Sequence, residues 1–393
     1  MQTIPLSIPN FEGNEKKYAD DAIQQGWVST GGAYIDKFEQ QLEDFLKVPK
    51  VAACQSGTSA LHLSLVECGV QPNDAVIVPA LTFIAAVNPV KYMFASPVFM
   101  DCDDSLCMDP VKLESFCENE CTFEDGKLLL KESKQHIKAV VVVHVFGNMA
   151  DMESIMSIAR KYNLKVIEDA TEALGTFYTE GKYSGKAAGT IGDFGAFSFN
   201  GNKIITTGGG GAVTASDADV ASHLKYLSTQ AKDDAVFYVH NEVGYNYRMT
   251  NVQAAIGVAQ MEELEEFISR KQNNYKSYAE LFKDCKYAKL IEFRSATSSN
   301  CWFYSLLINR GYISASLRDI IAALQQKGIQ TRAIWGLINE HKPYQNDIAY
   351  KVEKAPLYAE SVLNIPSTTQ ITSDEIEYVA KEIIELLEEL AND

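Results

Sequence analysis

One lysine, Lys203, lies between an apolar segment at residues 194–199 and a run of four glycines at residues 208–211. The apolar segment is short, aromatic and free of charge, which predicts a buried strand. A lysine at the end of such a strand lies beside apolar surface, where its amine becomes a candidate for Schiff-base chemistry. The glycines permit close backbone approach or positive φ. Taken alone, the pattern fits an exposed lysine before a glycine-rich hairpin slightly better.

Two further candidate sites follow short apolar segments. Ser56, Gly57 and Thr58 open an apolar helical pattern. The free amides of a helix N-terminus and the adjacent hydroxyls can hold a phosphate, although an ordinary helix cap is the commoner explanation. Phe83 follows the next apolar segment. Its ring either stacks on a planar ligand or belongs to the core.

An acidic pair ends another apolar segment. Strand alternation places Asp169 on the same face as Ile167, with Glu168 on the opposite face. Two acids at this position are costly unless one of them is paired. An aspartate aimed at a pyridine-type nitrogen would keep that nitrogen protonated and the ring an electron sink. A cap for the following helix is an equally good explanation.

Two polar positions complete the candidate set. Ser198 precedes Lys203 by five residues and is a further candidate phosphate ligand. Residues 244–251 concentrate an amide, a guanidinium and two phenols just before a long helical pattern. The alternative for this segment is a capped turn, with Thr250 or Asn251 as the cap.

Alternating strand and helix patterns position these candidates. Strands are predicted at 51–54, 75–78, 97–101, 138–145, 165–169, 194–199 and 211–215, and helices at 13–25, 36–47, 82–94, 109–121 and 151–162. The strands are continuous apolar runs, which is typical of a mainly parallel sheet with helices on both faces. Ligands bind at the carboxyl ends of the strands in such sheets.

A chain of 393 residues is too long for one core, which predicts two domains. We expect a large domain at residues 1–265 and a small C-terminal α/β domain at residues 266–393. A long helix at 250–283 connects them. Within the small domain, strands are predicted at 302–308 and 329–334, and helices at 316–327 and 373–390.

Composition excludes several classes of function. A net charge of −17 argues against a nucleic-acid-binding protein, because phosphate backbones require a basic face. No apolar run is long enough to span a membrane and no signal peptide is present, so we expect a cytoplasmic protein without a membrane partner. The eight cysteines form no Cys-x-x-Cys pair and the six histidines are scattered. Free thiols and no metal site are therefore expected.

The ordered combination of motifs carries a family resemblance. The stretches are SGTSALHL at 56–63, EDATEALG at 168–175, SFNGNKIITTGGGG at 198–211 and GYNYRMTNVQAAIG at 244–257. The chain resembles the DegT-type nucleotide-sugar aminotransferases, which are fold-type-I pyridoxal 5'-phosphate enzymes. The resemblance covers nearly the whole chain, and it is weakest at 110–135 and in the last third.

The resemblance implies a role for each candidate. Lys203 binds the cofactor as a Schiff base and then moves the proton, and Asp169 holds the pyridinium nitrogen. Phe83 covers the ring and Glu172 lies on the substrate side. The phosphate is held by Ser56, Gly57, Thr58, Ser198 and, from a partner subunit, Asn246. The last assignment implies a homodimer with shared active sites.

The resemblance also implies a substrate. The Asn-Gly-Asn-Lys motif at 200–203 with its glycine run is most similar to enzymes that aminate C4 of UDP-4-keto-6-deoxy-N-acetylglucosamine, with glutamate as donor. The alternatives are a 3-keto nucleotide sugar and, as a different class, a non-catalytic regulatory protein. Relatives usually carry histidine where this chain has Asn339, which cannot titrate near neutrality. That difference leaves the exact sugar open.

Overall fold

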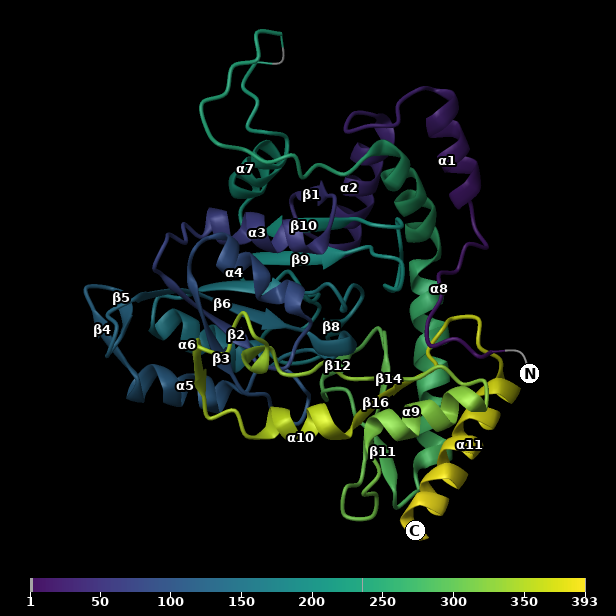
Figure 1. The fold of residues 1–393 in the computed structure, drawn as a ribbon. Helices are drawn as coiled ribbons and strands as arrows, with labels where there is room; N and C mark the ends of the chain where they lie inside the picture. Colours follow the sequence, from purple (N-terminus) through teal and green to yellow (C-terminus); the bar gives the residue numbers. More distant parts are fainter. Residues whose placement is uncertain (1–2, 235, 393) are drawn as a thin grey trace.

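The computed structural model describes residues 3–234 and 236–392. Within them, a central sheet lies between helices, and a smaller sheet lies beside it (Figure 1). The long helix α8 (Asn251–Phe282) runs between the two parts and contacts α1 (Glu15–Gln24) and α2 (Ala33–Leu46) near its start and α11 (Ser373–Asn392) further along.

The central sheet is mixed and mainly parallel. In order across the sheet, eight of its strands are β1 (Val51–Cys54), β10 (Gly211–Ala215), β9 (Phe194–Ser198), β7 (Lys165–Asp169), β6 (His136–Val143), β2 (Ala75–Pro79), β3 (Ser96–Met100) and β15 (Ile348–Tyr350). β10 pairs antiparallel with both its neighbours, and the pairs from β9 to β15 are all parallel. The carboxyl ends of β1, β9, β7, β6 and β2 therefore share one edge. This confirms the predicted fold-type-I α/β class.

Most of the helices that cover this sheet begin at a side-chain cap. They are α3 (Gly57–Glu67), α4 (Asn88–Tyr92), α5 (Pro110–Asn119), α6 (Met152–Lys161) and α7 (Ala218–Ser228). Ser56 caps α3, Asp109 caps α5 and Asp151 caps α6. Each of these side chains accepts a hydrogen bond from a backbone amide of the first turn, which would otherwise have no partner.

Two predictions for local structure are wrong, and one hairpin was not predicted. The helix predicted at 82–94 is a short 3₁₀ turn, η1 (Ile84–Ala86), followed by α4, because Pro89 can occupy only the first turn of a helix. The strand predicted at 329–334 is reduced to β14 (Arg332–Ala333). The helix predicted at 109–121 is confirmed as α5, but the sequence did not predict the hairpin of β4 (Cys121–Glu124) and β5 (Lys127–Leu130) that follows and pairs with β6.

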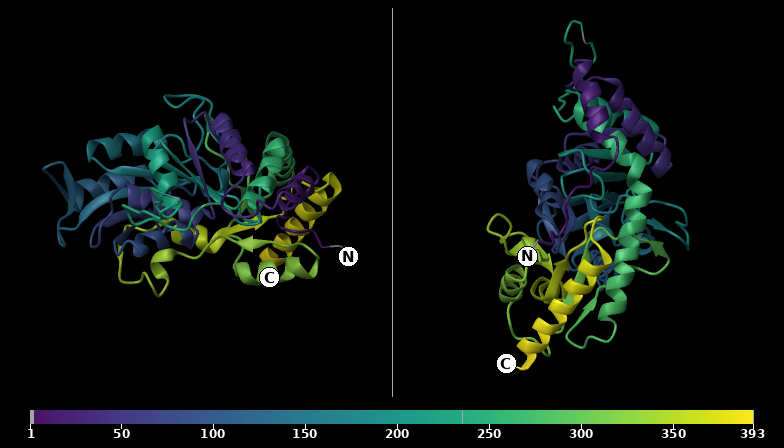
Figure 2. Two further views of the ribbon diagram at one scale, coloured as in Figure 1. Left: turned by 90° about the horizontal axis from the view of Figure 1, so that it is seen from above. Right: turned by 90° about the vertical axis from the view of Figure 1, so that its right-hand side faces the viewer.

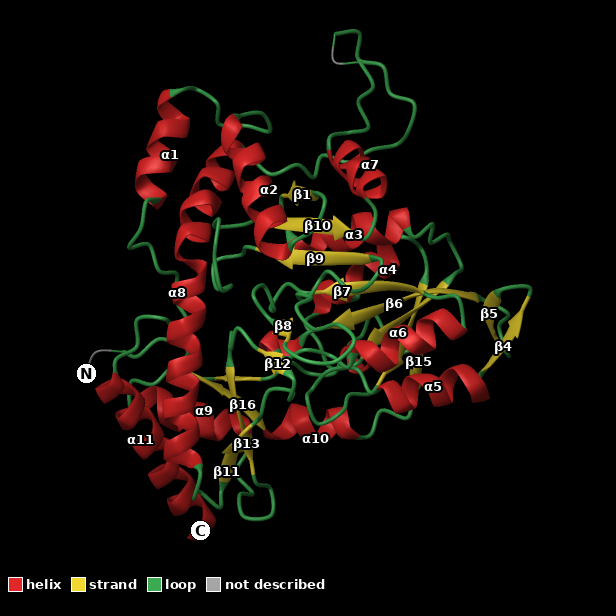
Figure 3. Ribbon diagram, turned by 180° about the vertical axis from the view of Figure 1, so that it is seen from behind, coloured by secondary structure: helices red, strands yellow, loops and turns green. Residues whose placement is uncertain are grey.

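The smaller sheet is antiparallel and has its own apolar cluster. Its order is β11 (Ala288–Leu290), β13 (Tyr304–Ile308), β16 (Val362–Ile365) and β14. Helices α9 (Leu317–Gln326) and α11 and the second half of α8 pack on it, and α10 (Lys354–Ser361) lies next to it (Figure 3). A two-stranded ribbon of β8 (Phe177–Tyr178) and β12 (Thr297–Ser298) joins the two parts. The proposed division at residues 265 and 266 falls inside α8.

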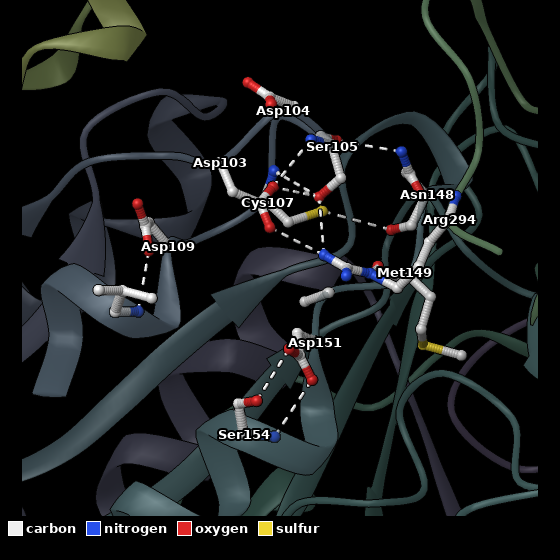
Figure 4. Close-up of polar contacts among 12 residues, drawn as sticks. Asp103, Asp104, Ser105, Cys107, Asp109, Asn148, Met149, Asp151, Ser154 and Arg294 are labelled. Atoms are coloured by element: carbon white, nitrogen blue, oxygen red, sulfur yellow. Dashed lines mark hydrogen bonds and ion pairs between the residues drawn. The ribbon is translucent and has the colours of Figure 1, made fainter. Parts of the chain in front are cut away.

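Arg294, in the segment before β12, forms hydrogen bonds to the loops that follow β3 and β6 of the central sheet (Figure 4). Its guanidinium donates to Asp103 Oδ2 at 2.8 Å, to Ser105 Oγ at 3.2 Å and to the Met149 carbonyl at 2.8 Å. Its backbone amide donates to Asn148 Oδ1 at 2.8 Å. The carboxylate of Asp103 raises the pKa of Arg294 against the opposing effect of burial, so this contact is a charged pair.

The described residues contain no helix that is both long and apolar enough to cross a membrane. They also contain no group of three or more His, Cys, Asp or Glu side chains arranged around a common point where a metal ion could bind. All eight cysteines are free thiols, and seven of them are buried.

Candidate functional site

A cavity of about 290 Å³ opens at the shared edge of the central sheet. Its walls come from the end of β6, the ends of β7 and β9 with the loops that follow, the start of α3, and the loop after β2. Eight of the nine predicted site residues line it: Ser56, Gly57, Thr58, Phe83, Asp169, Glu172, Ser198 and Lys203. Sequence positions more than a hundred residues apart thus converge because parallel strands bring their carboxyl ends together.

Lys203 is nearly buried between a carboxylate and an aromatic ring. Its side chain is 13% exposed, and its Nζ donates to Glu172 Oε1 at 3.4 Å. The same Nζ lies 4.2 Å from the centroid of the Trp302 ring. The lysine is therefore not the exposed strand-end residue of the simpler interpretation, and its amine faces the cavity.

The acidic pair divides into two roles. Asp169 lines the cavity, and its Oδ1 accepts from the Thr171 amide at 3.1 Å. Burial raises the pKa of Asp169, while the Thr171 hydrogen bonds and the charge of Lys203 oppose that rise. Glu168 points to the other face, where the amides of Gly189, Ile191 and Gly192 donate to it. The alternation predicted from sequence is confirmed.

His144 completes the shell around Glu168. The Ala150 amide donates to its Nδ1 at 3.1 Å, so the ring proton lies on Nε2, which donates to Glu168 Oε2 at 2.9 Å. Both side chains are fully buried. Both carboxylate oxygens of Glu168 thus accept hydrogen bonds from the protein itself. Asp169 is the acid of the pair that is available to a ligand.

Glu172 is the second acid of the cavity. Burial raises the pKa of its carboxyl, and the neighbouring Lys203 charge opposes that rise. Its Oε2 accepts from the Phe146 amide at 2.8 Å. Phe146 has φ 55°, a left-handed conformation that is uncommon for a residue with a side chain. The strained turn fixes one carboxylate oxygen and leaves the other for Lys203.

The N-terminus of α3 forms an anion seat next to these groups. Ser56 Oγ is engaged as the cap of α3, receiving the Ser59 amide at 3.1 Å. The amides of Gly57 and Thr58 belong to the first turn, where the helix dipole favours negative charge. A Cβ on Gly57 would lie 2.9 Å from Ser198 Cβ and from Thr171 Cγ2. Gly57 therefore brings the seat close to Ser198.

The glycine run serves close packing. A Cβ on Gly211 would lie 2.4 Å from the Ser56 carbonyl carbon and 2.6 Å from the Gly57 nitrogen. No side chain fits there without displacing backbone, so Gly211 holds β10 against the α3 N-terminus. Gly209 and Gly210 line the cavity.

Four sequence-predicted residues remain to be placed in detail. Phe83 is 55% exposed at the mouth of the cavity, so it is not a core phenylalanine. Asn246 is exposed and lies outside the lining of the cavity of its own chain. Asn339 sits on the 3₁₀ turn η3 (Ile338–Glu340), and in the described residues its buried Oδ1 has no hydrogen-bond partner. Thr250 caps α8, as one of the two sequence alternatives predicted.

Sequence reasoning missed the residues that hold Lys203 from the small-sheet side. Trp302 was predicted as the start of a strand, but β13 begins two residues later. The indole instead donates from Nε1 to the Asn202 carbonyl at 2.7 Å. Asn300 donates to the carbonyls of Glu172 and Leu174, both at 3.0 Å. The sequence feature that could have indicated them is the position of Asn300 and Trp302, two residues apart, directly before an apolar strand.

Comparison with known proteins identifies the family. Residues 9–384 match the model of the DegT/DnrJ/EryC1/StrS aminotransferase family. The chain belongs to this family. It is therefore an aminotransferase-family enzyme, and the resemblance predicted from the motifs is confirmed at family level.

Individual relatives agree over almost the full length. EpsN of Bacillus subtilis, assigned by name to the pyridoxal phosphate-dependent aminotransferases, is 34% identical over 95% of this chain and 92% of its own. GDP-perosamine synthase of Caulobacter vibrioides is 34% identical over 98% of this chain and 99% of its own. The crystal structure of a DegT DnrJ EryC1 StrS aminotransferase from Brucella abortus has a TM-score of 0.85 at 25% identity, with 95% of each chain covered.

Proposed function

We propose that this aminotransferase binds pyridoxal 5'-phosphate at Lys203 and transfers an amine from glutamate to a keto sugar carried on a nucleotide. The observation that carries the proposal is the convergence of Lys203, Asp169 and the α3 N-terminus on one cavity. Each of these would hold a different part of the cofactor. The amine of Lys203 would bind the carbonyl, the carboxylate of Asp169 would hold the ring nitrogen, and the α3 amides would hold the phosphate.

The donors and acceptors present fit that cofactor. The phosphate requires free amides and hydroxyls, which Gly57, Thr58 and Ser198 supply, in a cradle that a Cβ on Gly57 would fill. The ring nitrogen requires a buried carboxylate, which Asp169 supplies with one oxygen fixed by Thr171. When bound, the cofactor supplies an electron sink for the carbon that loses or gains a proton.

The side chains of the chain perform the proton handling. Lys203 Nζ would take and return the proton at the reacting carbon, a role that a positioned amine can perform. Glu172 orients Lys203 through its Oε1, because its other oxygen is tied to the Phe146 amide. Asp169 would keep the ring nitrogen protonated, and Phe83 would cover the ring at the mouth of the cavity.

The proposed acceptor is UDP-4-keto-6-deoxy-N-acetylglucosamine, aminated at C4. Support comes from the Asn-Gly-Asn-Lys motif and the glycine run at 200–211. A second candidate is a GDP-linked keto sugar, because a relative at 34% identity over nearly the whole chain is named a GDP-perosamine synthase. A 3-keto sugar would use the same lysine and aspartate.

The test of the cofactor is direct. Purified protein should be yellow, and borohydride should fix the cofactor mass on the peptide that contains Lys203. Protein that stays colourless with added pyridoxal phosphate would exclude the proposal, and a regulatory role would then replace it. A panel of UDP- and GDP-linked keto sugars with glutamate, followed by NMR of the product, would identify the nucleotide and the aminated carbon. An amine at C3 excludes the first candidate.

The proposed assembly is a homodimer in which Asn246 serves the site of the partner. Asn246 is exposed outside its own cavity, and the segment between α7 and α8 extends away from the body (Figures 1 and 2). This segment exposes apolar side chains at Val236, Phe237, Tyr238 and Val243. Such a surface is costly in water and is suited to a second copy of the chain.

Subunit mixing tests this arrangement. Lys203→Ala and Asn246→Asp subunits should each form an inactive homodimer. A heterodimer of the two rebuilds one intact site if Asn246 acts across the interface, so activity returns on mixing. Absence of recovery in mixed dimers, or an active monomer by light scattering, excludes a shared site.

A further inference from the structure

We propose that Trp302 is a positioning residue for Lys203: its ring supports the ammonium and its indole N–H anchors the preceding residue. This inference rests on the proposed role of Lys203. Trp302 lies outside the cavity lining and is 3% exposed, so it acts on ligands through Lys203.

Two contacts connect Trp302 to the lysine. Lys203 Nζ lies 4.2 Å from the ring centroid, within the range where an aromatic face attracts a cation, and tryptophan is the strongest of the rings in this respect. The indole Nε1 donates to the Asn202 carbonyl at 2.7 Å. The ring thus restricts the position of the Lys203 amine, and the hydrogen bond restricts the backbone at Asn202.

The indole is itself held rigidly. It stacks on Phe303 with centroids 4.0 Å apart and an interplanar angle of 16°. The Trp302 amide donates to Asn300 Oδ1 at 3.0 Å. The Trp302 carbonyl accepts from the buried Lys271 of α8 at 2.9 Å. A ring fixed at its backbone and on one face can impose a position on a flexible lysine, which otherwise loses much rotamer freedom when ordered.

The same short segment also orients the carboxylate partner of Lys203. Asn300 donates to the carbonyl of Glu172, and it accepts the amide of Trp302. Residues 299–303, from the strand-to-strand connection before β13, therefore hold both groups that flank the reactive amine. The small-sheet part of the chain fixes the geometry of a site that the central sheet builds.

The test measures Lys203 without the cofactor. Protein freed of cofactor is treated with limiting acetic anhydride, and acetylation of each lysine is read by peptide mass spectrometry. Trp302→Leu should increase acetylation of Lys203 by about 2- to 30-fold, the span expected for loss of a cation–π contact. Lys271 reports general loosening, because it contacts Trp302 only through the backbone carbonyl and should stay unlabelled.

Matched controls separate positioning from packing. Trp335→Leu removes the other tryptophan of the aromatic cluster around Phe146, and Lys203 labelling should be unchanged. Replacing tryptophan by analogues with successive ring fluorines keeps the shape and the N–H while weakening the attractive face. Lys203 labelling should then rise with each added fluorine, and this dependence on fluorination should be absent in Trp302→Phe. The fluorination experiment tests the proposal even if Trp302→Leu does not fold.

Three outcomes would overturn the inference. They are unchanged Lys203 labelling in Trp302→Leu, equal increases at Lys203 and Lys271, and no gradation with fluorination. The loaded enzyme gives a second readout, since Trp302→Phe should lower kcat with little change in KM for the sugar. Failure of borohydride fixation at Lys203 would remove the proposed function but leave the labelling result intact, so the two failures are distinguishable.

Discussion

Lys203 and Lys271 both have little exposed surface, at 13% of the side chain and 3% of the residue, and their surroundings differ. Lys203 lies at the edge of the central sheet beside the carboxylate of Glu172 and faces a cavity. Lys271 lies inside α8, 3% exposed, where it donates to the carbonyls of Trp302 and Ser367. Both lie near aromatic rings, Trp302 and Tyr304 respectively. Burial beside a ring is thus insufficient for function, which requires a cavity and the groups that meet a ligand there.

The largest effect should come from removing Lys203. Lys203→Ala should lose at least about 10⁴ in kcat, because the chain then has no positioned amine for proton transfer. Lys271→Met is the matched control, and it should retain borohydride fixation on the Lys203 peptide. The comparison fails if Lys271→Met abolishes fixation, or if Lys203→Ala turns over substrate at the rate of the unaltered enzyme.

The adjacent acids provide the next largest contrast. Asp169→Asn should reduce kcat by about 10²–10³, the scale of removing one preorganised electrostatic partner, with little change in thermal stability. Glu168→Gln should instead destabilise the fold by about 1–3 kcal/mol, because a donor NH₂ replaces one of the two oxygens that accept from His144 and three amides, which leaves buried donors without a partner. Steady-state kinetics and urea unfolding on both variants check the pair. Equal effects on kcat and stability in the two variants would contradict the division of roles.

The central sheet and the cavity could be predicted from the sequence because both depend on local patterns. The apolar runs before Asp169 and Ser198 define strands, and parallel strands bring their ends together whatever their spacing in the chain. The same reasoning missed Trp302 and misplaced the helix at 82–94. The contacts of Trp302 with Lys203 arise only when the two sheets meet, and a single proline outweighed the apolar pattern in the helix.

The buried Lys271 should show a distinct pH dependence of stability. Burial lowers the pKa of Lys271 to about 7, while the neighbouring Cys301 opposes that shift. The unfolded chain keeps the lysine proton up to a pKa of about 10.4, so between these values the unfolded state binds more protons. Stability should therefore rise with pH in this window, by up to ~1.4 kcal/mol per pH unit.

The check is a comparison of the wild type with Lys271→Met. Melting temperatures are measured from pH 6 to 10 in matched ionic strength. The difference between the two proteins should be flat below pH 7 and should then move in favour of the wild type. Parallel curves over the whole range would show that Lys271 has the same pKa in the folded and unfolded states, which contradicts the lowered pKa.

The smallest effect should come from Arg294, which joins the two parts of the chain outside the cavity that Lys203 lines (Figure 4). Arg294→Lys keeps the charge near Asp103 but cannot reach Asp103, Ser105 and the Met149 carbonyl together, because lysine has no planar fork of donors. We expect a loss of about 1–2 kcal/mol in stability. Cofactor fixation at Lys203 and the KM for the sugar should not change, since the site is held by Trp302 and Asn300 instead. A large fall in kcat at unchanged stability would contradict this separation. It would indicate that the Asp103–Arg294 contact helps to position the turn at Phe146, and through it Glu172.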